Sequence, residues 1–283
     1  MALVPAYFLL LLSAVSLSSL EVILRIAQNK GRNVMVIIIV NYCAAASVSC
    51  AALFTFGVER LSSYTIYLGI ITGIAYTTAM VLMMTSFPQR GVVLTGTIVQ
   101  LSVLIPTIIS VLIWAEKISS IQGYGIIIAI LSLPLLSVKS DEGGANRKSL
   151  LTALALFLVN GFGLAAGKIL LEAGYVGEQL VFYSILFASA SISSMPLIAL
   201  NKKSPSRLDF AVGLGVGTLN AIVSLTLVTA LITIPGSISF PFLSIVSSLL
   251  LIGMSFVILH EGINKTNALG IIIAITAVVL LST

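Results

Sequence analysis

Long apolar runs that contain almost no charge restrict the fold of this sequence more than any other feature. Each is about 20 residues long, the length that a helix needs to cross the hydrocarbon of a bilayer. Apolar residues follow one another continuously in these runs instead of alternating, which excludes a transmembrane barrel. The sequence therefore predicts an all-α polytopic membrane protein with ten transmembrane helices. Their approximate bounds are 3–27, 34–56, 64–86, 91–114, 119–138, 149–172, 178–200, 208–232, 236–259 and 264–282.

The charge content agrees with a chain that is solvated by lipid. Charged residues make up 8% of the 283 positions and hydrophobic residues 59%, whereas a soluble domain carries about 25% charged residues. The net charge of +5 comes from basic residues in short loops. No basic stripe is interleaved with aromatic residues, so we predict a bilayer as partner and no nucleic acid.

A hexapeptide that occurs twice indicates an internal duplication. GIIIAI begins at Gly125 and again at Gly270, and a glutamate, Glu116 or Glu261, lies nine residues before each copy. Further pairs recur at almost the same spacing. They are Arg25 with Lys168, offset by 143 residues, and Gly69 and Gly73 with Gly213 and Gly217, offset by 144.

The duplication predicts two five-helix repeats of opposite orientation. The first covers 1–139, the polar segment 140–148 is the linker, and the second covers 149–283. Five spans are an odd number, so the second copy must enter the membrane in the opposite sense. Inverted repeats of this kind are associated with alternating access.

The basic residues are unequally divided between the two sides of the predicted bundle. The richer side holds Arg25, Lys30, Arg32, Arg90, Lys139, Arg147, Lys148, Lys202, Lys203, Arg207 and Lys265. The poorer side holds Arg60, Lys117 and Lys168. Loops rich in Lys and Arg stay on the cytoplasmic side of a membrane. This count therefore predicts that both termini lie outside the cell. The expected membrane is a prokaryotic plasma membrane.

The ends of the fourth and ninth spans resemble the drug/metabolite transporter superfamily in its ten-helix EamA-like form. In "LSVLIPTIISVLIWAEKIS", Pro106 and Glu116 fit the pattern of a mid-helix proline followed by a turn with Gly-Glu, although Ala115 replaces the glycine. In "SLLLIGMSFVILHEGIN", Glu261 fits, whereas His260 and Leu251 stand in place of the glycine and the proline. Members of this family often have cytoplasmic termini, which conflicts with the charge count.

The resemblance implies a bundle with a central cavity that exports or exchanges small metabolites. The first four spans of each repeat would line the path. The fifth and tenth spans, with the two hexapeptides, would brace the outside or form the contact of a homodimer.

Two charged residues within spans are candidates for the cavity. Glu21 precedes Arg25 by four residues, the favourable order for an ion pair on one helix face. It could be a titratable coupling group or one half of an interfacial pair whose arginine reaches the membrane surface. Lys168 could bind an anionic group of the solute or reach the surface in the same way.

Uncharged polar side chains within spans complete the predicted cavity. They suit a neutral or zwitterionic solute, and their alternative role is hydrogen bonding between helices. These candidates are Asn41, Tyr42, Tyr76, Gln100, Asn160, Tyr183 and Asn220.

Helix-breaking residues and the two glutamates are candidates for gating. Pro106 is expected to free the carbonyl of Ser102 in a span, and Gly236 with Pro241 is expected to act similarly. Simple kinks are the alternative. Glu116 and Glu261 are expected at helix ends, where a glutamate can cap the following helix.

These features together favour a secondary transporter of small polar metabolites such as amino acids, working by alternating access. The alternative is a non-transporting integral membrane scaffold or assembly protein. An enzyme is not expected, because one histidine and nine scattered acidic residues offer no catalytic or metal cluster. No cofactor and no metal are predicted, and the partner is a small-molecule substrate.

Overall fold

The computed structural model describes residues 3–57, 61–113, 119–136, 147–200, 204–234, 236–259 and 265–281, and these residues are helical with short turns. No strand occurs among them. The first half contains α1 (Leu3–Asn29), α2 (Val34–Phe56), α3 (Ser63–Leu101), α4 (Leu104–Ile113) and α5 (Ser120–Leu136). The second contains α6 (Arg147–Glu172), η1 (Val176–Glu178), α7 (Gln179–Ser194), η2 (Met195–Leu200), α8 (Arg207–Thr233), α9 (Gly236–Met254), η3 (Ser255–Leu259) and α10 (Lys265–Leu281).

Seven helical segments are long and apolar enough to cross a membrane, and they come from α1, α2, α3, α6, α7, α8 and α9. The prediction of a helical, multi-pass membrane protein is confirmed at this level. Ten spans of about 20 residues are not all seen, because α5 and α10 have 17 residues each and α4 has 10.

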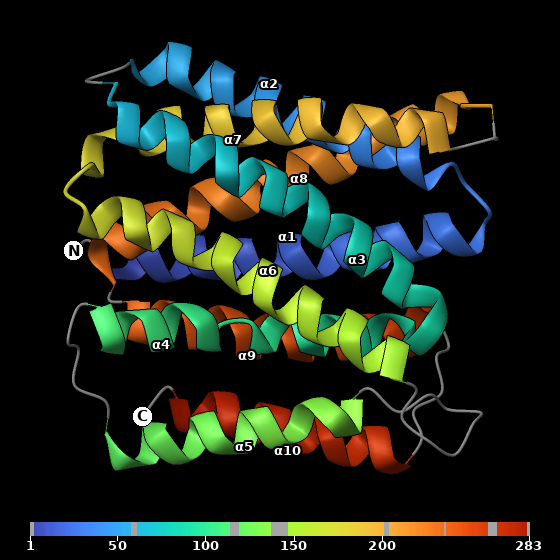
Figure 1. Ribbon diagram of the computed structural model, residues 1–283, viewed down its shortest axis with the longest axis vertical. Helices are drawn as coiled ribbons and strands as arrows, with labels where there is room; N and C mark the ends of the chain where they lie inside the picture. The colour runs from blue at the N-terminus through green and yellow to red at the C-terminus, as the bar shows by residue number, and fades with distance from the viewer. Residues whose placement is uncertain are drawn as a thin grey trace.

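The break between the third and fourth predicted spans takes an unexpected form. Helix α3 runs through the expected boundary, and its non-helical residue is Gly91, with φ 79° and ψ 173°. Tyr76 and Val99 both border one cavity, although 23 residues of straight helix would separate them by about 34 Å. The chain therefore turns back at Gly91, as Figure 1 shows.

The helices lie side by side, and the chain crosses the molecule repeatedly between two ends (Figure 1). Both termini lie at the same end. Helices α5 and α10 form a separate pair along one side, packed against each other. The long helices pack mainly across the predicted repeats: α2 and α1 on α8, and α7 and α6 on α3.

Glycines make the closest of these contacts possible. A Cβ on Gly73 of α3 would overlap the carbonyl oxygen of Leu186 in α7, and one on Gly217 of α8 would overlap that of Asn41 in α2. Small residues let helix backbones approach closely in membranes, where packing replaces the hydrophobic effect as the force between helices. Helix α3 is thus held at short range against α7, and α8 against α2.

Candidate functional site

A divided cavity lies in the centre of the bundle, and α1, α2, α3, α6, α8 and α9 supply its walls. One part, here the carboxylate chamber, has a volume of about 80 Å³ and is bordered by Glu21, Tyr42, Met80 and Met83. The other, here the hydroxyl chamber, has a volume of about 100 Å³ and is bordered by Gln100, Ser224, Phe240 and Ser244. The two chambers adjoin, because both are bordered by Leu17, Tyr76, Val99, Asn160 and Asn220.

Glu21 is the charged residue of the carboxylate chamber. It is fully buried, and neither of its carboxylate oxygens has a hydrogen-bond partner in the described part of the chain. The absence of a side chain at Gly96 makes room for this carboxylate, since a Cβ there would lie 2.7 Å from Glu21 Oε2. An ionised carboxylate in such a place costs much free energy unless a proton or a cation neutralises it.

The predicted ion pair between Glu21 and Arg25 is wrong. Arg25 Nη1 instead donates to Gln28 Oε1 at 3.3 Å, further along α1. Gln28 Nε2 in turn donates to the carbonyl oxygen of Met84 in α3, at 2.8 Å. Arg25 therefore borders neither chamber, and the Glu21 carboxylate has no hydrogen-bond partner among the residues that the structure describes.

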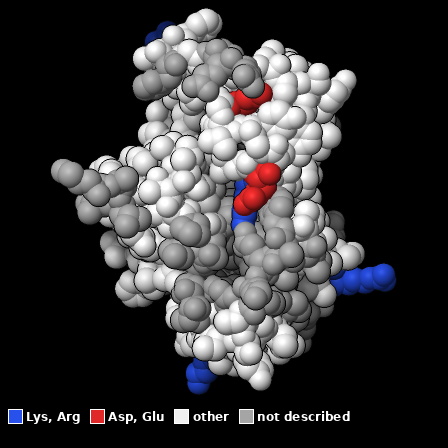
Figure 2. Space-filling view, turned by 90° about the vertical axis from the view of Figure 1, so that its left-hand side faces the viewer, with Lys and Arg blue, Asp and Glu red and all other residues white. Residues whose placement is uncertain are grey.

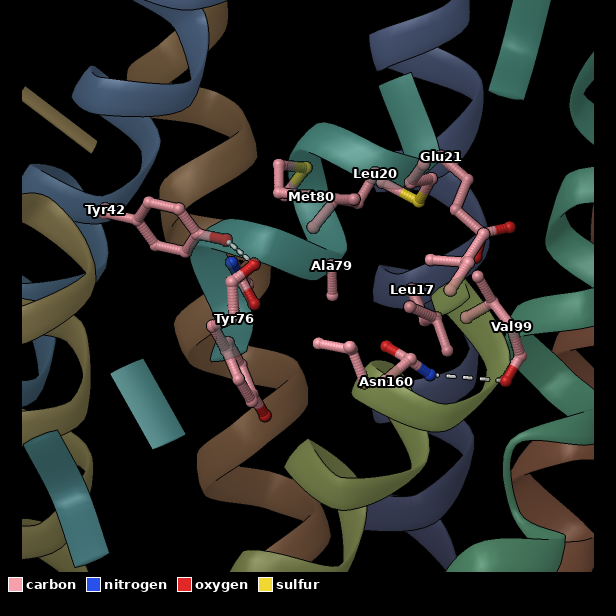
Figure 3. Close-up of a pocket in the computed structure, with 13 residues that line it drawn as sticks. Leu17, Leu20, Glu21, Tyr42, Tyr76, Ala79, Met80, Val99 and Asn160 are labelled. Carbon is pink, nitrogen blue, oxygen red and sulfur yellow. Dashed lines mark hydrogen bonds between the residues drawn. The ribbon is translucent and has the colours of Figure 1, made fainter. Parts of the chain in front are cut away.

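Tyrosines form the opposite wall of the carboxylate chamber. In Figure 3, Tyr42 and Tyr76 lie across the cavity from Glu21, Val99 and Asn160. The hydroxyl of Tyr42 donates to the carbonyl oxygen of Tyr76 at 2.7 Å. The Tyr76 ring packs edge-on against Phe187, with 6.0 Å between the ring centroids. The wall is thus aromatic, and one hydrogen bond and one ring contact fix its side chains.

Amides mark the middle of the cavity. Asn160 Nδ2 donates to the carbonyl oxygen of Val99 at 3.3 Å (Figure 3). Asn220 Nδ2 donates to Asn41 Oδ1 at 3.2 Å, so Asn41 orients the side chain of Asn220. Ser244 Oγ donates to the carbonyl oxygen of Gln100 at 2.9 Å. Hydroxyls and amides therefore line the central region and the hydroxyl chamber.

Six predicted cavity residues border the two chambers: Glu21, Tyr42, Tyr76, Gln100, Asn160 and Asn220. Three others do not. Asn41 lies behind Asn220, and Tyr183 is buried against Phe182 and Phe187. Lys168 is 6% exposed and approaches the start of α9, where a Cβ on Gly236 would lie 3.3 Å from its Nζ.

Lys168 nevertheless lies near the hydroxyl chamber. Leu164, one turn earlier in α6, borders that chamber, and Phe240, one turn after Gly236, does too. Figure 2 looks onto the end that carries the termini, and near the middle of this sparsely charged face a basic and an acidic side chain lie at a hollow. Lys168 and Glu172 belong to the α6 segment that reaches this end.

The predicted helix breaks are only partly as expected. Pro106 lies in the first turn of α4, where a missing N–H is tolerated. The Ser102 carbonyl oxygen, which we expected to be free, accepts from Ile105 N at 3.0 Å. The break itself lies at Ser102–Val103, before the proline. Gly236 begins α9, Pro241 lies five residues further along it, and Glu116 and Glu261 lie outside the described residues.

Comparison with known proteins shows the fold and no more. No family model and no curated protein matches the sequence. One solved structure, described only as "Crystal structure of protein", superposes with a TM-score of 0.70 at 12% sequence identity, covering 98% of this chain and 96% of the other. The arrangement of helices therefore occurs in another protein of similar length.

Sequence reasoning overlooked several residues that border the cavity. Ser224 and Ser244 were not singled out, because serine is frequent throughout the spans. Leu17 was overlooked because it is apolar, although it borders both chambers. The repeat spacing would have found it: Leu17 precedes Asn160 by 143 residues, the offset of Arg25 and Lys168.

Proposed function

We propose that this protein is a secondary transporter of small polar metabolites such as amino acids, with ten membrane passes in two inverted repeats. The observation that carries the proposal is the central cavity between helices of both repeats, with an unpaired buried carboxylate beside amides and hydroxyls. Buried ionisable groups in a membrane bundle are expensive and mark solute or ion pathways.

Matched contacts support the duplication. Gly69 would place a Cβ 3.3 Å from the Phe182 carbonyl oxygen, and Gly213 would place one 3.1 Å from that of Ile37. A Cβ added to Gly73 would lie 2.7 Å from the Cβ of Ser189, and one added to Gly217 would lie 2.7 Å from the Cβ of Ala44. In each matched pair of contacts the two glycines are 144 residues apart and their two partners are 145 residues apart.

The arrangement of the helix ends supports the predicted topology. The two termini share one end of the bundle (Figure 1). The helices that start or end at the opposite end carry Lys30, Arg32, Arg147, Arg207 and Lys265 there. By the positive-inside rule, this distribution supports the proposal that both termini lie outside. Labelling a tag at each terminus on intact cells tests this orientation.

A carboxylate without a salt-bridge partner makes proton coupling the first mechanism to test. Glu21 would be neutralised by a proton in one step of the cycle and by a cationic group of the solute in another. Exchange without protons is the alternative, since Glu21 is the one acidic side chain among the described residues that border the two chambers.

The first experiment is a thermal-shift screen of the purified protein with amino acids, sugars, nucleotides, phosphorylated metabolites and lipophilic cations at two pH values. A ligand at about 100 times its Kd stabilises the folded state by about 2.7 kcal/mol. A hit is then assayed for flux in proteoliposomes. Binding with flux supports the proposal. A screen without hits, together with no flux of any tested solute, would favour the scaffold interpretation.

A further inference from the structure

We propose that the parts that move against each other during transport are two interleaved units and not the two sequence repeats. One unit consists of α1, α2, α8 and α9, and the other of α3, α4, α6 and α7. Each unit contains two helices from the first half of the chain and two from the second. This inference rests on the proposed function and specifies its moving parts.

Backbone-to-backbone contacts hold each unit together. Gly73 of α3 lies against the Leu186 carbonyl in α7, and Gly217 of α8 lies against the Asn41 carbonyl in α2. A glycine that meets backbone leaves no flexible atom that could yield. These helix pairs therefore move as single bodies, although α3 and α7 belong to different repeats, as do α2 and α8.

Buried capping clusters fasten the same helix pairs at their ends. Glu178, before α7, accepts from Ser62 N at 3.0 Å and from Ser62 Oγ at 2.8 Å, and Ser62 is the N-cap of α3. Asp209, in the first turn of α8, accepts from the backbone N–H of Asn33 at 3.4 Å, and Asn33 is the N-cap of α2. Hydrogen bonds to buried carboxylates are stronger than neutral ones.

Further hydrogen bonds join the remaining helices within each unit. Ser13 and Ser18 of α1 donate to carbonyl oxygens in α8 and α9, at 3.0 and 2.9 Å. In the other unit, Thr77 Oγ1 of α3 donates to the Ala190 carbonyl oxygen in α7 at 2.9 Å. Asn160 joins α6 to α3 through the Val99 carbonyl oxygen.

The cavity lies between the two units. Leu17, Glu21 and Tyr42 border the carboxylate chamber from one unit, and Tyr76, Met80 and Asn160 border it from the other. Hydrogen bonds also cross this boundary, from Gln28, Tyr42 and Ser244 to carbonyl oxygens of α3, and α2 packs along α7. Among the described glycines, however, those at the boundary meet side chains: a Cβ on Gly96 would approach Leu251 Cδ2 and Glu21 Oε2. Sliding of the units therefore requires exchange of these side-chain contacts and no separation of glycines from facing backbone.

Two engineered disulfides separate this assignment from rocking of the sequence repeats. Both use a background with Cys43→Ser and Cys50→Ser. Thr77→Cys with Ser193→Cys, whose hydroxyl oxygens are 2.8 Å apart, lies within one unit. Gly96→Cys with Leu251→Cys lies between the units. Loss of the leucine side chain removes its overlap with the added Cβ, which still lies 2.7 Å from Glu21 Oε2, so Gly96→Cys alone is the control for displacement of this carboxylate. Both disulfides join the two sequence repeats.

The readout is labelling of Leu17→Cys, a residue that borders both chambers, by an impermeant maleimide in vesicles of either sidedness. We expect labelling from both sides in the reference and in the Thr77–Ser193 disulfide. The Gly96–Leu251 disulfide should reduce labelling from one side by about tenfold or more, because it removes one state of a two-state equilibrium. Reduction of the disulfide should restore it.

The outcomes distinguish the two proposals. If the Thr77–Ser193 disulfide also abolishes labelling from one side and reduction restores it, the interleaved units are wrong while alternating access stands. Unchanged two-sided labelling in the Gly96–Leu251 disulfide would contradict the assignment as well. A reference that is labelled from one side only would overturn alternating access itself, and the moving units with it.

Discussion

Glu21 and Met80 border one chamber of the cavity, whereas Leu164 and Ser224, 143 and 144 residues later, border the other. The glycines outside the cavity show no such difference, since Gly69 and Gly73 make the same contacts as Gly213 and Gly217. Positions that set the distance between helices are thus alike in the two halves, and positions that face the cavity differ. A solute in this cavity would meet a carboxylate and thioethers on one side and hydroxyls on the other.

The largest effect is expected where the halves are alike. Gly73→Ala and Gly217→Ala each place a methyl group into a facing backbone carbonyl, and overpacking of this kind costs about 1–3 kcal/mol or more. Both variants should melt at clearly lower temperature in detergent. The matched control is Gly215→Ala, also in α8, where an added Cβ would have no atom of another described helix within 4 Å. It should gain up to about 1 kcal/mol from helix propensity.

Equal melting of all three glycine variants would break the comparison. The glycines would then have no role in the spacing of the helices, and the matched contacts in the two halves would not contribute to the stability of the fold.

Glu21→Gln should remove the pH-dependent component of transport, because the amide keeps the shape and cannot carry a proton. The matched control is Leu164→Gln, which places the same amide at the equivalent position of the hydroxyl chamber. Flux in proteoliposomes is measured with and without a pH gradient. Persistence of pH-driven flux in Glu21→Gln would exclude this carboxyl as the coupling group.

The capping clusters allow a smaller and graded test. Glu178→Ala removes the acceptor of three hydrogen bonds, from Ser62 N, Ser62 Oγ and Thr65 Oγ1. Removing a buried charged acceptor leaves its donors unsatisfied and costs about 1–3 kcal/mol. Asp209→Ala, at the other end of the molecule, loses the contacts with Ser206 and Asn33 and should cost about 1–2 kcal/mol.

Melting temperatures of the two alanine variants in one detergent compare the clusters directly. Glu178→Gln keeps an acceptor oxygen and should recover part of the loss. If Glu178→Ala melts like the unaltered protein, the cluster does not fasten α3 to α7.

The smallest effect is expected at Asn160 and its counterpart. Asn160→Leu loses one hydrogen bond, to the Val99 carbonyl oxygen, and one amide from the cavity wall. A loss of about 1 kcal/mol corresponds to roughly fivefold weaker solute binding. Leu17→Asn, in the other half, should add an amide without that loss. Solute affinity from the concentration dependence of the thermal shift gives the comparison, and equal affinities would place Asn160 outside the binding site.

The apolar runs predicted the helices well because a bilayer imposes length and composition on each segment. The matched glycines in the sequence also correspond to matched helix contacts, although which backbone carbonyls they meet is visible only in the structure. By contrast, the spacing of Glu21 and Arg25 gave a wrong ion pair. Spacing on a helix permits a contact, and the partner chosen depends on neighbours such as Gln28 and Met84.

Side-chain direction explains most of the remaining differences at the site. Asn41 and Tyr42 are adjacent in α2, yet Tyr42 borders the cavity and Asn41 lies behind Asn220. Tyr183 packs among aromatic rings that are distant in sequence from the cavity residues. The position of each face depends on the rotation of its helix, and uniformly apolar spans contain little periodic signal to fix that rotation.

The reversal at Gly91 has a consequence for how the chain is made. Its two arms are joined at Gly91 without an intervening loop, so they follow each other directly as the chain is synthesised and form one helical hairpin. Arg90, buried beside the turn, donates from Nη2 to the Ser149 carbonyl oxygen at the beginning of α6. This hydrogen bond of the hairpin tip can form only after α6, which follows α4 and α5 in the chain, has been made.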